Sequence, residues 1–474
     1  MSKIFKAFRH LALTAHALAA IIFVSGCSLI PSYERPASPV AAQWPASAQP
    51  GQAGLQTNPL PGWQDYFTDA TLRQLITTAL ANNRDLRVAT LNIEQARAQL
   101  GIRRADQFPT LNAAVTGSRT PTSAGGINSA YAAGLTVTAY ELDFFGRVAS
   151  LKEQALAQYL ATSEAAQTAQ ISLIATVAQG WLALLADEEL LAVSRQTLAS
   201  RTDSLKLVEL KVQHGAASDF ELRSAQTLLE STRVTLAQQQ RQRALDENAL
   251  VLLLGQPLDE ASRAQLRRDK AIPLRLAELP AGLPSELLAR RPDIRQAEQL
   301  LIASNANIGA ARAAFFPRIS LTVGAGSASS ALSGLFKDGS WGWTLAPQLV
   351  LPIFDAGRNQ ANLDVARTGR EIAVAQYEKA IQNAFREVAD ALASRATLAQ
   401  QVQASQALLE AETARNQLTQ LRLDHGVANQ LEWLDARRSL FAAQQALVQT
   451  RLAYQQNQIA LFKTLGGGAV APQP

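Results

Sequence analysis

The chain has 474 residues, of which 47% are hydrophobic and 18% charged, so it is long and apolar enough to bury the cores of several domains. Lysine and arginine number 44 against 39 acidic residues, but three of the basic residues and no acid lie in the first 26 positions. Without that segment the chain is close to neutral, which removes the main argument for a nucleic-acid-binding protein. One cysteine excludes an intrachain disulfide, and with four histidines it argues against a His/Cys metal site or a Cys–His nucleophile.

The first 26 residues have the pattern of a secretory signal peptide. A basic start precedes an apolar run at residues 11–24, which is short for a membrane span of about 20 residues. The run ends in Val-Ser-Gly-Cys at Cys27, which resembles the bacterial lipobox; the alternative is an ordinary signal peptide with a chance cysteine. We expect Cys27 to become the first mature residue and to carry an S-diacylglycerol and an N-acyl chain. Because Ser28 follows, and not the aspartate that resembles an inner-membrane retention signal, we expect the outer membrane as destination.

The rest of the chain contains an internal duplication. Residues 81–87 (ANNRDLR) align with residues 289–295 (ARRPDIR). The same offset relates two segments that contain Phe-Pro, and motifs that contain glycine recur in the same order farther along both repeats. Residues 28–62 are instead rich in proline, alanine and glutamine, which predicts an extended arm. The predicted organisation is a lipoprotein-type signal peptide (1–26), a lipidated extended arm (27–67), a first repeat (68–255), a linker (256–283), a second repeat (284–466) and a tail (467–474).

Each repeat predicts a helix followed by two strands. Residues 72–107 and 285–316 are helical in composition, and a proline follows each of them closely. Alternating apolar and polar residues come next, the pattern of outer-membrane strands, at residues 111–115, 135–139, 319–325 and 341–353. Four strands cannot close a barrel, which needs about eight, so several chains would have to share one. A pair of soluble hairpins on an ordinary domain is the alternative.

Two very long helices are predicted after the strands. Residues 148–213 and 359–424 contain no proline, and each run would measure about 100 Å as one continuous helix. Both runs end at a His-Gly pair, where glycine favours the left-handed cap and the histidine faces the negative helix end. Apolar residues spaced by seven in the returning segments predict coiled-coil-like packing. We therefore assign turn and capping roles, and no catalytic role, to the hairpin-tip residues His214, Gly215, His425 and Gly426.

This pattern resembles the outer-membrane factor family of TolC-like channels, and within it the OprM-type lipoproteins. The resemblance is collinear over almost the whole mature chain and is most specific at residues 63–67 (WQDYF), 83–87 (NRDLR), 141–147 (ELDFFGR), 290–295 (RRPDIR), 310–317 (AARAAFFP) and 351–358 (LPIFDAGR). It implies an α+β membrane protein of duplicated β-hairpins and long α-helical hairpins. A homotrimer would form a twelve-stranded outer-membrane β-barrel and a twelve-helix periplasmic α-barrel.

The resemblance implies the passive exit duct of a tripartite pump in a Gram-negative bacterium, and no enzyme. Its partners would be a periplasmic adaptor (membrane fusion) protein, an inner-membrane transporter of the resistance-nodulation-division type and outer-membrane lipid, with no nucleic acid. No cofactor is expected beyond the lipid on Cys27. The alternative is the duct of a type I protein or peptide secretion system. A periplasmic adaptor is disfavoured by the duplication, and a glycan-processing enzyme by the lack of an arguable acid pair.

In this family acidic and bulky side chains narrow the periplasmic mouth where the helical hairpins turn. The residues that match this gate in the second hairpin are Leu431, Glu432, Asp435 and Arg438. Three copies would bring six carboxylates together, which attracts cations. The first hairpin has Ser224 in place of Asp435 and supplies other charges, so we expect the second to form the tighter ring; these charges are Asp219, Glu221 and Arg223. The alternative is an ordinary salt bridge between residues three apart on an exposed helix.

Overall fold

The computed structural model describes residues 28–45, 61–123, 125–267, 276, 279 and 291–467. These residues form two compact units, and each unit draws on both repeats. The first unit takes its described residues from the ranges 1–37, 91–163 and 296–379, and the second from 38–90, 164–295 and 380–474. Cys27, the predicted lipidation site, lies outside the described residues.

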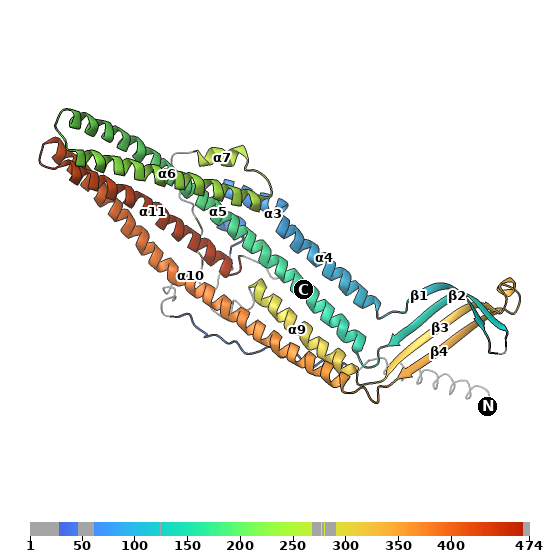
Figure 1. Ribbon diagram of the computed structural model, residues 1–474. Helices are drawn as coiled ribbons and strands as arrows, with labels where there is room; N and C mark the ends of the chain where they lie inside the picture. Colours follow the sequence, from blue (N-terminus) through green and yellow to red (C-terminus); the bar gives the residue numbers. More distant parts are fainter. Residues whose placement is uncertain are drawn as a thin grey trace. The chain divides into compact units, whose positions relative to one another are not determined.

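A four-stranded antiparallel sheet dominates the first unit (Figure 1). Its order is β1 (Leu111–Pro121), β2 (Ile127–Leu142), β3 (Arg318–Ser329) and β4 (Trp341–Val350), so that all four predicted strands are present. The two hairpins meet where β2 pairs with β3, and Gly134 lies opposite Gly326. A Cβ atom on either glycine would overlap the backbone of the facing strand, so this close approach requires glycine. β1 and β4 form the outer edges and have no further strand partner among the described residues.

The sheet exposes large apolar side chains. Every residue of β4 is exposed, and so is nearly every residue of β1. The exposed side chains include Val115, Trp341, Trp343 and Leu349. A water-soluble monomer rarely leaves such an apolar surface uncovered, whereas a membrane strand places it against lipid.

The helical part of the first unit packs α9 (Pro292–Ala313) against the start of α10 (Arg358–Asp424), as Figure 1 shows. Ile308 of α9 and Leu363 and Ala366 of α10 form a buried apolar cluster. A short 3₁₀ helix, η3 (Leu332–Gly334), lies in the connection between β3 and β4.

Two long helical hairpins build the second unit. The first joins α5 (Arg147–Gln213) to α6 (Asp219–Leu254), and the second joins α10 to α11 (Gln430–Thr464). The two longest helices each begin one residue before the predicted start and end where predicted. Part of α5 is long and apolar enough to cross a membrane by length and composition, but half of that stretch is buried inside the protein. An apolar helix segment that is half buried in this way packs against neighbouring helices.

Shorter helices precede and follow the first hairpin along the chain. The predicted helical stretch at residues 72–107 is divided into α3 (Ala70–Asn82) and α4 (Arg84–Ala105). Asn83 makes the break: its side chain accepts a hydrogen bond from the Leu86 N–H at 2.9 Å and donates one to the Leu253 carbonyl at 2.9 Å. Among its described residues, the second unit also contains α2 (Trp63–Tyr66) and α7 (Glu260–Leu266).

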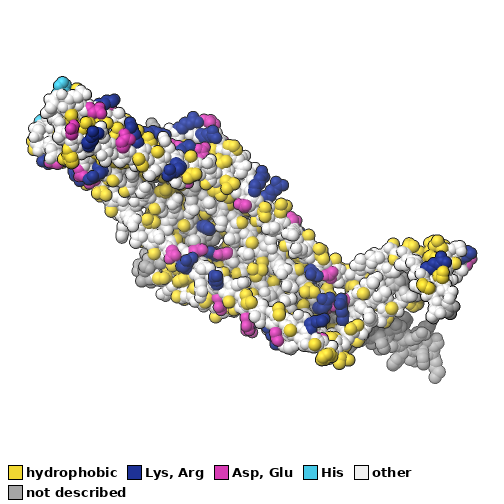
Figure 2. Space-filling view, in the orientation of Figure 1, with side chains coloured by type: hydrophobic (Ala, Val, Ile, Leu, Met, Phe, Trp, Pro, Cys, Tyr) yellow, Lys and Arg dark blue, Asp and Glu magenta, His cyan; other side chains and the backbone are white. Residues whose placement is uncertain are grey.

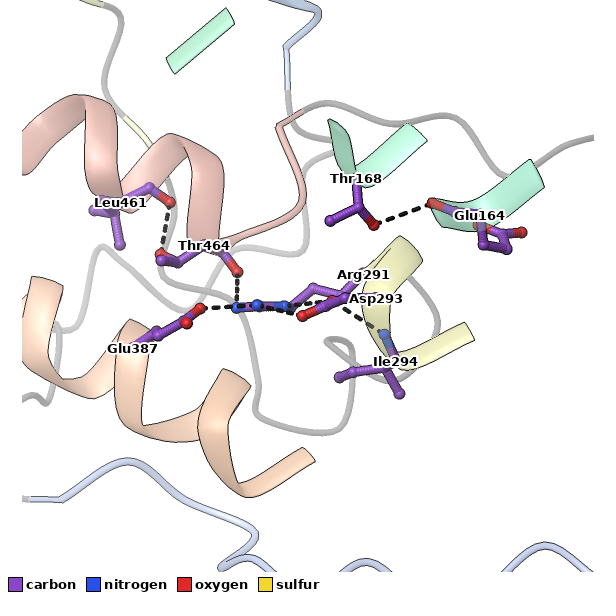
Figure 3. A network of polar contacts seen from close by, with 8 residues as sticks. All are labelled: Glu164, Thr168, Arg291, Asp293, Ile294, Glu387, Leu461 and Thr464. Carbon is purple, nitrogen blue, oxygen red and sulfur yellow. Dashed lines mark hydrogen bonds and ion pairs between the residues drawn. The ribbon is translucent and has the colours of Figure 1, made fainter. Parts of the chain in front are cut away.

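A buried arginine ties three chain segments together in the second unit (Figure 3). Arg291 precedes α9 and is 7% exposed. Its guanidinium donates to both carboxylate oxygens of Asp293 at 2.9 and 2.7 Å, and to Glu387 of α10 at 2.8 Å. It also donates to the Thr464 carbonyl at the end of α11 at 3.0 Å. These are charge-assisted hydrogen bonds, which hold the start of α9 and the two helices of the second hairpin in one place.

We expect Arg291→Met to lower the free energy of unfolding by about 2 kcal/mol. This is below the about 3–5 kcal/mol of fully buried ion pairs, because Asp293 and Glu387 are about a third or more exposed and would regain water. Denaturant unfolding followed by circular dichroism measures the change. The matched control is Arg233→Met, which removes an arginine from an exposed pair with Glu230 and should cost less than about 1 kcal/mol. Equal losses in the two variants would contradict a structural role for Arg291.

Candidate functional site

The ends of the two helical hairpins are where sequence analysis places the gate. Gly215 follows His214 after α5 with a φ of +70°, and Gly426 follows His425 after α10 with a φ of +72°. This backbone conformation favours glycine, and it lets each chain reverse into the next helix. Neither histidine side chain makes a hydrogen bond to the described part of the chain. Side chains of both charge signs gather at this end, as Figure 2 shows.

In the second hairpin, ion pairs join α10 to α11. Asp435 of α11 accepts a hydrogen bond from the Arg415 Nη2 atom of α10 at 3.0 Å and a second one from Arg438 of its own helix. Glu432 lies 3.9 Å from the Arg422 Nη2 atom. Both predicted gate carboxylates therefore have cationic partners within one chain, so a ring of three copies would be a ring of compensated charges.

Arg415 and Arg422 were missed by the sequence analysis. They face the gate residues only because α10 and α11 run antiparallel, so that residues at similar distances before and after the turn become neighbours. Arg422 and Glu432 lie at similar sequence distances before and after the turn at Gly426. The same is true of Arg415 and Ser439, which are 3.4 Å apart. This symmetry about the turn is the sequence signal from which both arginines could have been predicted. Leu431, the remaining predicted gate residue of this hairpin, is exposed at the start of α11.

In the first hairpin, the charged residues predicted for the gate lie in the first turns of α6 and make their contacts there. Glu221 and Ser218 form a capping box at the start of α6, in which the Glu221 carboxylate accepts the Ser218 N–H at 2.7 Å. Asp219 lies in the first turn of α6, and Arg223 donates to Gln226 of the same helix at 3.0 Å. None of these side chains makes an ion pair across the hairpin with a described residue, so the two hairpin ends are built differently.

The arm that follows Cys27 lies along α9 in the first unit. The Leu29 carbonyl accepts from Arg312 at 3.2 Å, and the Pro31 carbonyl accepts from Asn305 at 2.7 Å. Farther along, Glu298 accepts two hydrogen bonds from Arg35, at 2.7 and 2.9 Å, and one from the Tyr33 hydroxyl at 3.0 Å. Burial and the neighbouring Glu298 carboxylate raise the pKa of Tyr33 to about 12, so the hydroxyl keeps its proton and donates it.

Gly309 marks the place where the arm comes closest to α9. A Cβ atom at this position would lie 2.6 Å from the Ile30 side chain, so the arm is seated directly on the helix backbone. Ile30 is three positions after Cys27. No group of three or more histidine, cysteine or acidic side chains that could hold a metal ion occurs among the residues that the structure describes.

Comparison with known proteins identifies the class: the chain belongs to the outer membrane efflux protein family, whose model matches residues 75–256 and 283–467. It is 47% identical over 461 residues to the solvent efflux pump outer membrane protein SrpC of Pseudomonas putida, covering 95% of this chain and 97% of the relative. It is 46% identical to outer membrane protein OprJ of Pseudomonas aeruginosa over 460 residues, 95% of each chain. The open state of the MtrE outer membrane channel of Neisseria gonorrhoeae superposes with a TM-score of 0.85 at 40% identity, covering 93% of this chain and 98% of that one.

These comparisons confirm the predicted family and fold class. Each repeat contributes a β-hairpin and a long helical hairpin, and the solved channels share this TolC-like fold. The family consists of outer-membrane channels and is not a class of enzymes. The protein is accordingly an outer-membrane protein.

Proposed function

We propose that the protein is the exit duct of a tripartite efflux pump, through which drugs or other small toxic compounds leave the cell. The observation that carries the proposal is a sheet with two open edges, in a chain that matches efflux proteins over nearly its full length. The named relatives serve solvent, toluene and antibiotic efflux pumps, which favours small compounds over secreted proteins as cargo. A periplasmic adaptor and an inner-membrane transporter of the resistance-nodulation-division type would complete the pump, and that transporter would supply the energy.

The assembled duct is proposed to be a homotrimer. A membrane strand cannot leave its backbone groups unpaired in lipid, so β1 and β4 need partners from other chains. Four strands from each of three chains would make a closed barrel, above the minimum of about eight strands. The exposed apolar side chains of β1 and β4 would then face lipid.

Cross-linking of the purified protein in detergent should stop at a trimer, and these trimers should conduct ions in planar bilayers. Gly326→Ala should abolish both properties, because its Cβ atom would overlap the Ala133 carbonyl and separate the two β-hairpins. The matched control is Gly342→Ala in β4, where a Cβ atom meets nothing within 4 Å, and it should preserve both. A stable wild-type monomer with its full strand content would contradict the shared barrel.

The proposed gate is the end of the second hairpin. It differs from a ring of unpaired carboxylates, because Arg415 and Arg438 both bind Asp435 and more than balance its single negative charge. The pair to Arg415 also links the two helices of the hairpin. Both partners of that pair are nearly half exposed, so water can replace them at low cost when the mouth opens.

In planar bilayers the wild-type trimer should conduct poorly and discriminate only weakly between cations and anions, because the carboxylates of the gate are paired with arginines. Asp435→Ala should shift selectivity toward anions, because it leaves two arginines without their carboxylate. Arg415→Ala should do the opposite by leaving the carboxylate with one partner. Glu221→Ala is the control, since Glu221 caps α6 and should leave conductance unchanged. Unaltered conductance and selectivity in Asp435→Ala would contradict a gate at this end of the hairpin.

Lipidation of Cys27 is also proposed, with an S-diacylglycerol and an N-acyl chain and no other cofactor. The lipobox-like sequence supports it, and so do the contacts of the arm with α9, which fix the chain within a few residues of Cys27. A palmitate analogue should label the protein in growing cells, Cys27→Ala should abolish the label, and Ser28→Ala should keep it. Sorting or assembly should suffer more than transport, since the barrel itself holds the membrane. A label that survives Cys27→Ala would overturn this assignment.

A further inference from the structure

Two arginines of the second unit lie together without an acidic partner. Arg201, on α5, is 5% exposed. Its Nη1 atom donates to the Leu228 carbonyl of α6 at 2.7 Å and to the Thr232 hydroxyl at 2.5 Å. Its Nε and Nη2 atoms are buried and have no hydrogen-bond partner. A buried N–H group without a partner is costly, and the cost is larger on a charged group.

The second arginine comes from the other hairpin. Arg437, on α11, donates to the Ser204 hydroxyl, one helical turn from Arg201 on α5. Aromatic rings cover one face of each guanidinium: the Trp433 centroid lies 4.6 Å from the Arg437 Cζ atom, and the Phe441 centroid 5.2 Å from that of Arg201. No carboxylate of the described chain is within ion-pair distance of either arginine.

Both groups remain cations at neutral pH. Burial and the neighbouring Arg437 charge lower the pKa of Arg201 to about 10, and burial also lowers the pKa of Arg437. A pKa of about 10 still leaves Arg201 protonated at pH 7. Two neighbouring positive charges therefore lie between the hairpins and repel each other, and a bound anion would offset that repulsion.

The free edge of Arg201 has the geometry of an oxyanion receptor. Three other arginines of this protein hold carboxylates with the same two atoms, Nε and Nη2, at distances of 2.7 to 2.9 Å. These pairs are Arg35 with Glu298, Arg147 with Glu141, and Arg291 with Asp293. In Arg201 neither atom of that edge has a hydrogen-bond partner among the described residues.

We propose that Arg201 and Arg437 form a binding site for a small oxyanion, a carboxylate, phosphate or sulfate, that joins the first helical hairpin to the second. The planar fork of Arg201 binds two oxygen atoms at once, which favours an oxyanion over chloride. Arg437 is half-buried and marks the side from which the anion enters. The bound anion neutralises the repulsion between α5 and α11, and so holds the hairpins together below their ends.

The test uses the purified full-length protein in detergent, with inorganic sulfate as the probe and sodium chloride at matched ionic strength as the reference. Sulfate should raise the melting temperature of the wild-type protein in a saturable manner, and calorimetry should give one site per chain. Arg437→Gln should weaken sulfate binding by about tenfold or more, since it removes a charged partner. Arg201→Met should abolish binding, and without sulfate it should melt no lower than the wild type because it removes a buried unpaired charge.

Arg233→Gln is the matched control, because it removes an exposed arginine of α6 and should keep the full sulfate response. Sulfate also stabilises proteins in general, but that effect does not saturate and is common to all variants. An equal sulfate response in the wild type and Arg437→Gln would overturn the site, whatever the behaviour of Arg201→Met. A response to chloride as large as that to sulfate would overturn the oxyanion assignment.

Discussion

The open edges of the sheet are the constraint on which the rest of the molecule depends. Lipid offers no hydrogen bonds, so a strand in the membrane must be paired on both sides. One chain pairs β2 with β3 across its internal duplication and leaves β1 and β4 unpaired. In the proposed homotrimer, the other two copies provide the missing strand partners. The glycine pair Gly134 and Gly326 makes the internal join possible, because only glycine permits the two backbones to approach so closely.

Much of the fold could be predicted because its signals are periodic and repeated. The absence of proline and the terminal His-Gly pairs delimit α5 and α10 to within one residue. The break at Asn83 was not predicted, because it depends on a contact with the Leu253 carbonyl, 170 positions away. The partners of Asp435 were predicted only on its own helix. Arg415 is recognised as a partner once the antiparallel pairing of α10 and α11 is known.

The second hairpin contains a buried set of ion pairs and an exposed set, and the two differ in strength. At its base, Arg291 is buried and joins α10 to the end of α11 through charge-assisted hydrogen bonds. At its end, Arg415 and Asp435 are each nearly half exposed, and a surface pair of this kind is worth about 0–1 kcal/mol. The base therefore resists separation, while the end can exchange its partners for water. The proposed gate needs this difference, because movement confined to the end of the hairpin leaves the packed core intact.

The contact between the two hairpins differs from these ion pairs, because it brings two positive charges together. Arg201 and Arg437 place like charges on facing helices, where most buried contacts of these helices are apolar. Thr232, Ser204 and two aromatic faces compensate part of the charge, but they leave the Nε–Nη2 edge of Arg201 unsatisfied. An interface held by packing alone would have a fixed strength. With an oxyanion bound at the proposed site, the strength of this interface depends on the anions around the protein, so the medium influences how firmly the first hairpin is held against the second.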